Sequence, residues 1–283
     1  PLDGWGGIGG NGNNDDTAGR ADRFTAGVAY LEGKKPSGVF VRGWYGRTVA
    51  AAWDLNKGKL RFRWVFDSKD AKNPFSGQAN HQLSIGDLDA DGKDEICVGA
   101  MVIDDDGSGL YTTGLRHGDA LHISDMDPDR PGLEVFGIHE NEGRTLKLRT
   151  PGVALFDAAT GNILFEKGRS IDVGRGVAAD IDPTHPGFEN WGGPGGLRDI
   201  HGNTISQNTP SSTNFLVWWD GDLTRELLDQ NRIDKWNWQT QTTENLLTAN
   251  GSVANNGTKA TPCLSADLFG DWREEVIWRT PDS

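Results

Sequence analysis

The sequence predicts an all-β fold, and three features support this prediction. Apolar segments are short and are bounded by turn-forming residues, which is typical of strands. The 283-residue chain contains 39 glycines and 12 prolines, so turns are frequent. Two kinds of segment, an Asp-rich loop and a β-hairpin, also recur along the chain. Small sheets that repeat in this way are typical of a β-propeller.

The clearest strand candidates are short apolar runs with turn residues on both sides. Each is four or five residues long, which suits a strand better than a helix. Irregular spacing between the repeats indicates long loops inserted between strands, and the repeats suggest about four or five propeller blades. The predicted strands cover residues 38–41, 49–53, 95–99 and 275–278.

A hairpin pattern occurs in residues 53–62 and again in residues 156–165. Both copies place a glycine four residues after an aspartate, at Asp54 and Gly58 and at Asp157 and Gly161. A glycine there permits the positive φ that a tight turn requires. Residues 219–221 are expected to form a third, shorter copy of this hairpin.

The Asp-rich loop is followed by a glutamate and an apolar strand. Its first copy carries Asp87, Asp89, Asp91 and Asp94 with Gly92 at the bend, so that oxygen ligands alternate around one calcium ion. An EF-hand is excluded because the twelfth position is Val98 and the flanking segments are strand-like. The alternative is a solvated acidic turn, which the alternation of ligands disfavours. The later copies offer Asp125, Asp127, Asp129 and Glu134, then Asp180, Asp182 and Glu189, and finally Asp267 and Asp271.

A second kind of metal site is predicted from histidines near the first two loops. His81 precedes the first loop, His117 and Asp119 precede the second, and Glu140 follows the strand after it. If the loops occupy equivalent positions in neighbouring blades, these four side chains converge. Two imidazoles and two carboxylates suit zinc or manganese at least as well as calcium. The alternative is a set of surface histidines with ordinary hydrogen bonds.

The net charge of −13 argues against nucleic acid or an anionic membrane as a partner. No run of about 18 apolar residues exists to span a membrane. The two cysteines, Cys97 and Cys263, leave a disulfide open. The chain begins at Pro1 without a signal peptide, so we expect a processed or excerpted form of a longer precursor.

Two basic residues stand out in this acidic chain. Arg175 is flanked by glycines, which leave its side chain accessible to a ligand. Lys259 follows the Asn256-Gly257 pair, which is a strong turn signal. Taken alone, both are better explained as solvated surface cations.

Several longer motifs together resemble the family 11 polysaccharide lyases, the bacterial rhamnogalacturonan lyases. The resemblance runs from about residue 22 to the end, and the Gly- and Asn-rich residues 1–21 match it poorly. The motifs are DDDGSGLYTTG at 104–114, HGDAL at 117–121, DPDRPGLEVF at 127–136, DVGRG at 172–176, WWDGDL at 218–223, NNGTKATP at 255–262 and GDWREEVIWR at 270–279.

The resemblance implies a secreted, calcium-dependent enzyme with an eight-bladed propeller, of which this chain would cover about half or slightly more. The missing portion of the propeller would then be a partner of these residues. The implied substrate is rhamnogalacturonan I, an acidic polysaccharide of the plant cell wall, cleaved by β-elimination. His81, His117, Asp119 and Glu140 would form an active-site metal site, Arg175 and Lys259 the catalytic pair, and Asn256, Gly257 and Thr258 the galacturonate contacts.

Two other function classes compete with a lyase. A non-catalytic, calcium-stabilised propeller that binds carbohydrate or protein would share the Asp-rich loops but has no need of the basic pair. A glycoside hydrolase would need a positioned pair of carboxylates, and it would release saturated products. The acidic residues of this chain are instead assigned to metal.

Overall fold

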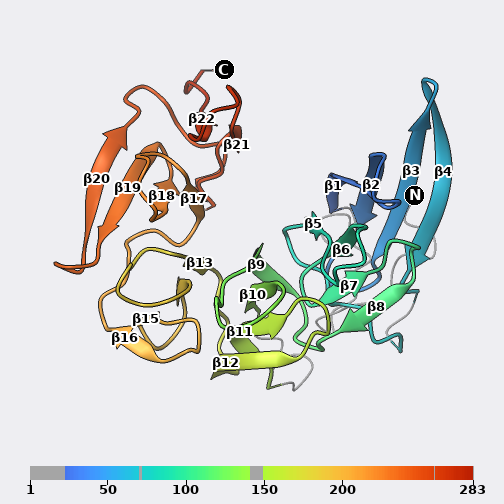
Figure 1. Cartoon of the computed structure of the whole chain (residues 1–283), viewed down its shortest axis with the longest axis horizontal. Coiled ribbons are helices and arrows are strands. Elements are labelled where there is room, and N and C mark those ends of the chain that lie inside the picture. Colours follow the sequence, from blue (N-terminus) through green and yellow to red (C-terminus); the bar gives the residue numbers. More distant parts are fainter. Residues whose placement is uncertain (1–22, 70–71, 141–148, 258, 283) are drawn as a thin grey trace. The chain divides into compact units, whose positions relative to one another are not determined.

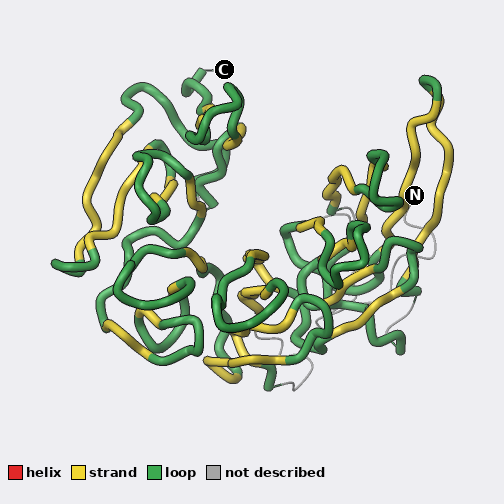
Figure 2. Tube along the Cα trace, in the orientation of Figure 1, coloured by secondary structure: helices red, strands yellow, loops and turns green. Residues whose placement is uncertain are grey.

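The computed structural model describes residues 23–69, 72–140, 149–257 and 259–282. Over these residues the chain consists of strands and loops, and no helix is present (Figure 2). Within the same residues there is accordingly no helix long and apolar enough to cross a membrane. The expected all-β class is therefore confirmed. Residues 1–21, which match the family motifs poorly, lie outside the described part of the chain.

The described residues form six sheets, five of four strands and one of two strands. Within every sheet the strands are antiparallel and follow one another in sequence order, because short turns connect neighbouring strands. The count exceeds the four or five units expected from the repeats. The four predicted strand segments are confirmed as β2, β3, β6 and β22.

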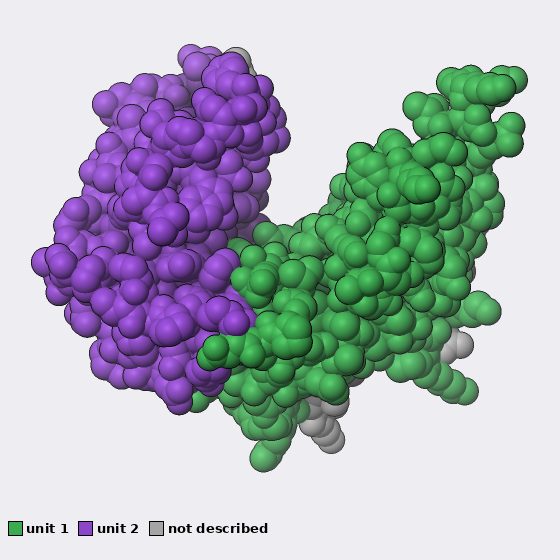
Figure 3. Space-filling view, viewed as in Figure 1, with its two compact units in different colours: residues 1–125, 129–174 green, residues 126–128, 175–283 purple. Residues whose placement is uncertain are grey.

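The chain divides into two compact units, coloured separately in Figure 3. The first unit contains residues up to 125 and 129–174, and it holds three sheets. Their strands (Figure 1) are β1 (Phe24–Ala29), β2 (Ser37–Arg42), β3 (Val49–Asn56) and β4 (Lys59–Asp67); β5 (Ser84–Gly86), β6 (Glu95–Cys97), β7 (Met101–Ile103) and β8 (Gly109–Thr112); and β9 (Gly118–Ser124), β10 (Glu134–His139), β11 (Pro151–Asp157) and β12 (Ile163–Arg169).

The second unit contains residues 126–128 and 175–283 and holds the remaining three sheets. Their strands are β13 (Val177–Ala179), β14 (Glu189–Trp191), β15 (Leu197–Arg198) and β16 (Thr204–Ser206); β17 (Phe215–Val217), β18 (Glu226–Asp229), β19 (Arg232–Asn237) and β20 (Thr242–Thr248); and β21 (Leu264–Ala266) with β22 (Glu275–Ile277).

The core lies between sheets of the same unit. In the first unit, alternate residues of β2 and β3, including Val39, Val41 and Ala50, are fully or almost fully buried. They belong to one apolar cluster with Ile96 and Met101 of the second sheet. Burial of alternate strand residues is the expected consequence of a two-residue side-chain period.

Two of the predicted hairpins are confirmed. The β3–β4 turn places Gly58 at φ 74°, and the β11–β12 turn places Gly161 at φ 73°. The expected third copy at residues 219–221 is wrong, because that segment lies in the loop between β17 and β18. The third copy is instead the β19–β20 turn, in which Gln241 has φ 54° and Asn237 caps the turn. Asn237 and Gln241 stand where the other two copies have aspartate and glycine, so the sequence pattern did not identify this turn as a copy.

Each Asp-rich loop connects the first strand of a sheet to the second, and the second strand begins with the glutamate of the repeat. In the first, third and last of these loops, and in the similar loop before Glu226, one carboxylate oxygen of the glutamate accepts hydrogen bonds from backbone N–H groups of its own loop. This bonding folds the loop back over the strand end. The donors are Leu88 and Asp89 to Glu95, Ile181 and Asp182 to Glu189, Trp219 and Asp220 to Glu226, and Leu268 to Glu275.

The two cysteines are free thiols, so the disulfide left open by the sequence is not formed. Cys97 is completely buried at the end of β6, whereas Cys263 is exposed just before β21.

Candidate metal centres and catalytic residues

The predicted cluster of His81, His117, Asp119 and Glu140 is present in the first unit. Their ligand atoms all lie within 4.8 Å of one another. Nε2 of His81 is 3.1 Å from an oxygen of Asp119, and Nε2 of His117 is 3.7 Å from an oxygen of Glu140. All four side chains are buried or largely shielded from solvent. The structure therefore brings together residues separated by up to 59 positions in the sequence.

Backbone hydrogen bonds at the strand ends hold this cluster together. The N–H of His81 donates to the carbonyl of Gly118, and the N–H of Glu140 donates to the carbonyl of His117. Gly118 begins β9, next to an irregularity in the register with β10. A Cβ atom on Gly118 would collide with the carbonyl oxygen of Ile138, so this close approach of the two strands requires glycine.

His117 is oriented as a metal ligand. Its Nδ1 lies 2.5 Å from the carbonyl oxygen of Ala79, to which it donates. This bond fixes the neutral tautomer whose Nε2 lone pair faces Glu140. Burial, together with the nearby His81, lowers the pKa of His117 to about 3, so the ring is neutral at physiological pH. Two imidazoles with two carboxylates fit a divalent cation.

Two aromatic residues of the loop between β2 and β3, which the sequence reasoning missed, pack against this cluster. The ring of Tyr45 lies 4.0 Å from that of His117, and the ring of Trp44 lies 4.4 Å from that of His81. The hydroxyl of Tyr45 is 3.3 Å from Nε2 of His81. Nothing in the local pattern around Tyr45 and Trp44 signalled this role, because the contact depends on how two sheets pack.

The first Asp-rich loop holds a cluster that differs in part from the predicted one. Asp87 and Asp89 group with Glu95, which in turn groups with Asp104 and Asp105 from the loop after β7. Burial raises the pKa of Glu95 to about 7, and its second oxygen, Oε1, has no hydrogen-bond partner. A buried carboxylate oxygen without a partner is costly, so this arrangement fits a bound cation.

The other two predicted ligands of this loop have different partners. Asp94 accepts a hydrogen bond from the N–H of Tyr30. Asp91 accepts from the backbone and the ammonium of Lys93. Neither side chain belongs to the cluster that includes Glu95. Glu95 was visible in the sequence as the repeated glutamate, but its role depends on the loop folding back onto the strand.

In the second loop the described residues form no group of three close ligating atoms. Arg130 instead bridges Glu134 and Asp157, with N–O distances of 3.3 Å and 2.6 Å. Asp125 and Asp129 are exposed, whereas Asp127 is buried with His201 at 3.9 Å.

The third loop likewise shows no such group among the described residues. Asp182 contacts Thr184 and His185. Burial raises the pKa of Glu189 to about 8, and Oε1 of Glu189 and Oδ1 of Asp180 are buried without partners. These two orphaned oxygens are the feature of this loop that fits a cation.

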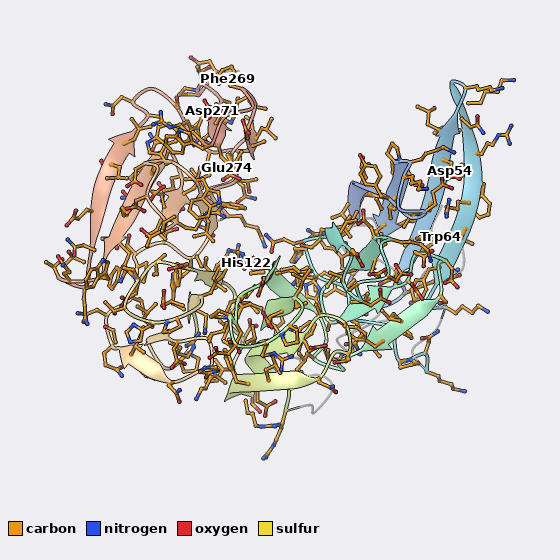
Figure 4. The ribbon with its side chains drawn as sticks, in the orientation of Figure 1. Asp54, Trp64, His122, Phe269, Asp271 and Glu274 are labelled. Carbon is orange, nitrogen blue, oxygen red and sulfur yellow. The ribbon has the colours of Figure 1, made fainter. Side chains whose placement is uncertain are left out.

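The last loop lies between β21 and β22, where Figure 4 labels Asp271 and Glu274. Asp267 accepts hydrogen bonds from the N–H groups of Gly270 and Asp271, and Asp271 accepts from that of Arg273. Both aspartates therefore stabilise the turn, and no three-residue ligand group forms here within the described part of the chain.

A further acidic cluster, which the sequence analysis did not assign to metal, consists of Asp220, Asp222 and Glu226. The two aspartates lie in the loop between β17 and β18, whose residues 219–221 were expected to form a hairpin, and Glu226 is the first residue of β18. The glutamate at the start of an apolar strand was the available signal, as in the other loops.

Arg175, in the second unit, precedes β13 and is partly buried. Its Nε donates to Oδ1 of Asn214 over 3.1 Å, and the amide nitrogen of Asn214 donates to Asp229 over 2.9 Å. Asp229 is itself buried. The hydrogen bond to Asn214 holds Nε in place and so gives the guanidinium group a defined orientation. Such an orientation suits the binding of a carboxylate by the outer guanidinium nitrogens.

Lys259 lies in a turn that Asn256 closes. The side-chain oxygen of Asn256 accepts the N–H of Lys259, and its carbonyl oxygen accepts the N–H of Ala260. Asn256 and Gly257 also line a hollow of about 270 Å³ together with Gln230, Asn231 and Ser252. Two of the predicted substrate contacts thus line a concave surface, whereas Thr258 lies outside the described residues.

Comparisons with known proteins agree with the motifs. The family model described as "Rhamnogalacturonan lyase family 11, C-terminal domain" matches residues 5–283, a range that begins within the poorly matching segment 1–21. The chain is 55% identical to the rhamnogalacturonan endolyase YesW of Bacillus subtilis (strain 168), over 95% of this chain and 43% of the relative. It is 50% identical to the rhamnogalacturonan exolyase YesX of the same organism, over 100% of this chain and 47% of the relative.

A solved structure supports the same relationship. The crystal structure of rhamnogalacturonan lyase YesW superposes with a TM-score of 0.87 at 56% identity, covering 93% of this chain and 44% of that chain. The chain spans about half the length of the curated relatives that it matches. With the family model matching nearly all of its residues, this chain belongs to rhamnogalacturonan lyase family 11.

Proposed function

We propose that this chain is the catalytic part of a calcium-dependent lyase that cleaves the rhamnose–galacturonate bonds of rhamnogalacturonan I by β-elimination. The observation that carries the proposal is the family match over residues 5–283, which includes the motifs around Arg175 and Lys259. The six sheets, each built of sequential antiparallel strands, would be blades of a propeller completed by the rest of the protein. Because a cell-wall polymer lies outside the cell, the enzyme would act there.

The reaction removes the C5 proton of a galacturonate and breaks its C4–O bond. In its neutral form, the Lys259 amine takes the C5 proton, and the electron pair of the C5–H bond forms the C4=C5 double bond. The C4 oxygen leaves with the neighbouring rhamnose and gains a proton from solvent. Arg175, steadied by Asn214, pairs with the galacturonate carboxylate and stabilises the negative charge that develops during proton removal.

His81, His117, Asp119 and Glu140 would hold a divalent cation, calcium in our proposal and manganese as the nearest alternative. When bound, this ion would add positive charge for an anionic substrate. It would also explain how a protein of net charge −13 binds a polyanion.

The test follows ultraviolet absorbance while the protein, at its natural length, is incubated with rhamnogalacturonan, with and without a calcium chelator. The C4=C5 double bond conjugated to the carboxylate gives a rise in absorbance, and chelation should abolish it. Lys259→Ala should lose the rise while remaining folded. Lys167→Ala, at an exposed position on β12, is the matched control and should keep it.

Two results would overturn the proposal. A folded, calcium-replete protein that binds the polymer without any absorbance change would instead be a carbohydrate-binding module. Release of saturated products would mean hydrolysis. Because the two relatives are named as an endolyase and an exolyase, the size distribution of early products should be recorded in the same experiment.

A further inference from the structure

A positively charged side chain from β19 lies against the acidic cluster of the loop between β17 and β18. The ammonium of Lys235 lies 2.6 Å from Asp220, 2.7 Å from Asp222 and 2.7 Å from Glu226. Only 17% of the Lys235 side chain and 1% of the Glu226 side chain are exposed. The ammonium thus lies among the same three carboxylates that form the acidic cluster of this loop.

The register of the sheet explains why a lysine reaches this position. Lys235 lies on β19, next to β18 (Figure 1), and the pairing of Leu227 with Asp234 places Lys235 opposite Glu226. In the three other four-stranded sheets that carry an Asp-rich loop, the register puts an aspartate opposite the repeated glutamate. These aspartates are Asp104 opposite Glu95, Asp157 opposite Glu134 and Asp199 opposite Glu189. Among these four described sheets, the charge at this position is reversed in the sheet of Glu226 alone.

The hydrogen bonding of the glutamates shows the effect of that reversal. In Glu95, Glu189 and Glu226 alike, Oε2 accepts two backbone N–H groups of the loop. Oε1 of Glu95 and of Glu189 is buried without a partner, whereas Oε1 of Glu226 accepts from Lys235 over 2.7 Å. Oε1 therefore lacks a positively charged partner in the loops of Glu95 and Glu189, whereas in the loop of Glu226 the ammonium of Lys235 is that partner.

An ammonium at this distance also leaves no room for a metal. Calcium–oxygen distances are about 2.3–2.6 Å, so an ion bound by these three carboxylates would need the space that Nζ of Lys235 occupies. Displacing Lys235 would require a buried cation to give up three charge-assisted contacts.

We propose that Lys235 is the built-in counter-ion of the 219–226 loop, and that it stabilises this loop without a divalent metal and excludes calcium from it. The first Asp-rich loop, with Asp104 at the equivalent position, would by contrast depend on a bound cation. The inference is independent of catalysis, because it concerns only the charges within one sheet.

The first experiment counts calcium ions bound per chain by equilibrium dialysis, using the protein at its natural length. Asp222→Asn removes a half-exposed carboxylate of the cluster and is expected to leave the number of bound ions unchanged. Loss of one ion in Asp222→Asn would mean that calcium binds in this loop and would overturn the proposal.

The second experiment removes the lysine itself. Lys235→Ala leaves three carboxylates around an empty position, so it should bind one more calcium ion than the wild type, and its melting temperature should rise with calcium by more than that of the wild type. Lys235→Met fills the position without a charge, so it should melt lower than the wild type with or without calcium. Lys167→Ala is the control for losing one positive charge.

If folded Lys235→Ala binds no additional calcium at saturation, the proposal is wrong. If Lys235→Ala does not fold, the number of calcium ions bound by Asp222→Asn decides.

Discussion

Nε of Arg175 lies 3.1 Å from the side-chain oxygen of Asn214, which reaches it from 39 positions along the chain. The amide of Asn214 is in turn fixed by Asp229, a buried residue at the end of β18. The three side chains form a continuous hydrogen-bonded series within the second unit. Asn214 is therefore a positioning residue for Arg175.

Asn214→Ala should reduce kcat/KM toward rhamnogalacturonan by roughly 10- to 100-fold, because a hydrogen bond to a charged group contributes about 1.5–3 kcal/mol. The loss should fall mainly on kcat, since a misdirected guanidinium still attracts the polymer but aligns its carboxylate poorly. Steady-state kinetics would separate the two constants. Asn162→Ala, in an exposed turn, is the control, and equal kinetics for both variants would contradict the role of Asn214.

His117→Ala should weaken divalent-metal binding at the His81 cluster by more than about 100-fold, because changes even to outer partners of metal ligands cost 10- to 100-fold. Titration with Mn²⁺, followed by electron paramagnetic resonance, measures this directly without an activity assay. His201→Ala is a suitable control because that side chain is exposed and lies in the other unit. Unaltered Mn²⁺ affinity in His117→Ala would remove His117 from the site.

Gly118→Ala should destabilise the fold and the metal cluster together. The added Cβ would meet the carbonyl oxygen of Ile138, and relieving that overlap would displace both His117 and Asp119. Overpacking of this kind costs about 1–3 kcal/mol in unfolding free energy. Gly58→Ala is the comparison, since its Cβ would meet nothing although its φ of 74° is also unfavourable for alanine. Denaturant unfolding should show the larger loss for Gly118→Ala, and only that variant should lose metal affinity.

The two thiols should differ sharply in reactivity. Burial raises the pKa of Cys97 to about 12, so at pH 8 it is a protonated, enclosed thiol, whereas Cys263 is exposed. Because the thiolate is the reactive form, iodoacetamide should label Cys263 quickly and Cys97 only after unfolding. Mass spectrometry of the labelled peptides distinguishes them. Rapid labelling of Cys97 in the folded protein would show that the β6 region opens readily.

The sequence predicted the features that depend on neighbouring residues. Short apolar runs predicted β2, β3, β6 and β22, and the Asp-to-Gly spacing predicted two hairpin turns. The third hairpin was missed because Asn237 and Gln241 perform the same capping and positive-φ roles with different side chains. More than one residue type can form the same turn, so a search for fixed residue types at fixed spacing misses some copies.

The sequence also predicted some of the candidate metal ligands better than others. The repeated loops correctly pointed to His81, His117, Asp119 and Glu140 as a converging group. The loop aspartates were less informative, since several of them cap their own turns. Whether an aspartate faces a shared centre or its own backbone depends on the path of the loop, and alternation in the sequence does not specify that path.

The sequence by itself determined the strand-forming class of this chain, two of its hairpin turns and the residue types available for metal and substrate. The tertiary structure decided which of them meet. The residue opposite each repeated glutamate, Asp104 for Glu95 but Lys235 for Glu226, is set by strand register, and the partner of Arg175 is set by the arrangement of strands around it. Contacts of this kind depend on distances through space, which a linear pattern of residue types does not contain.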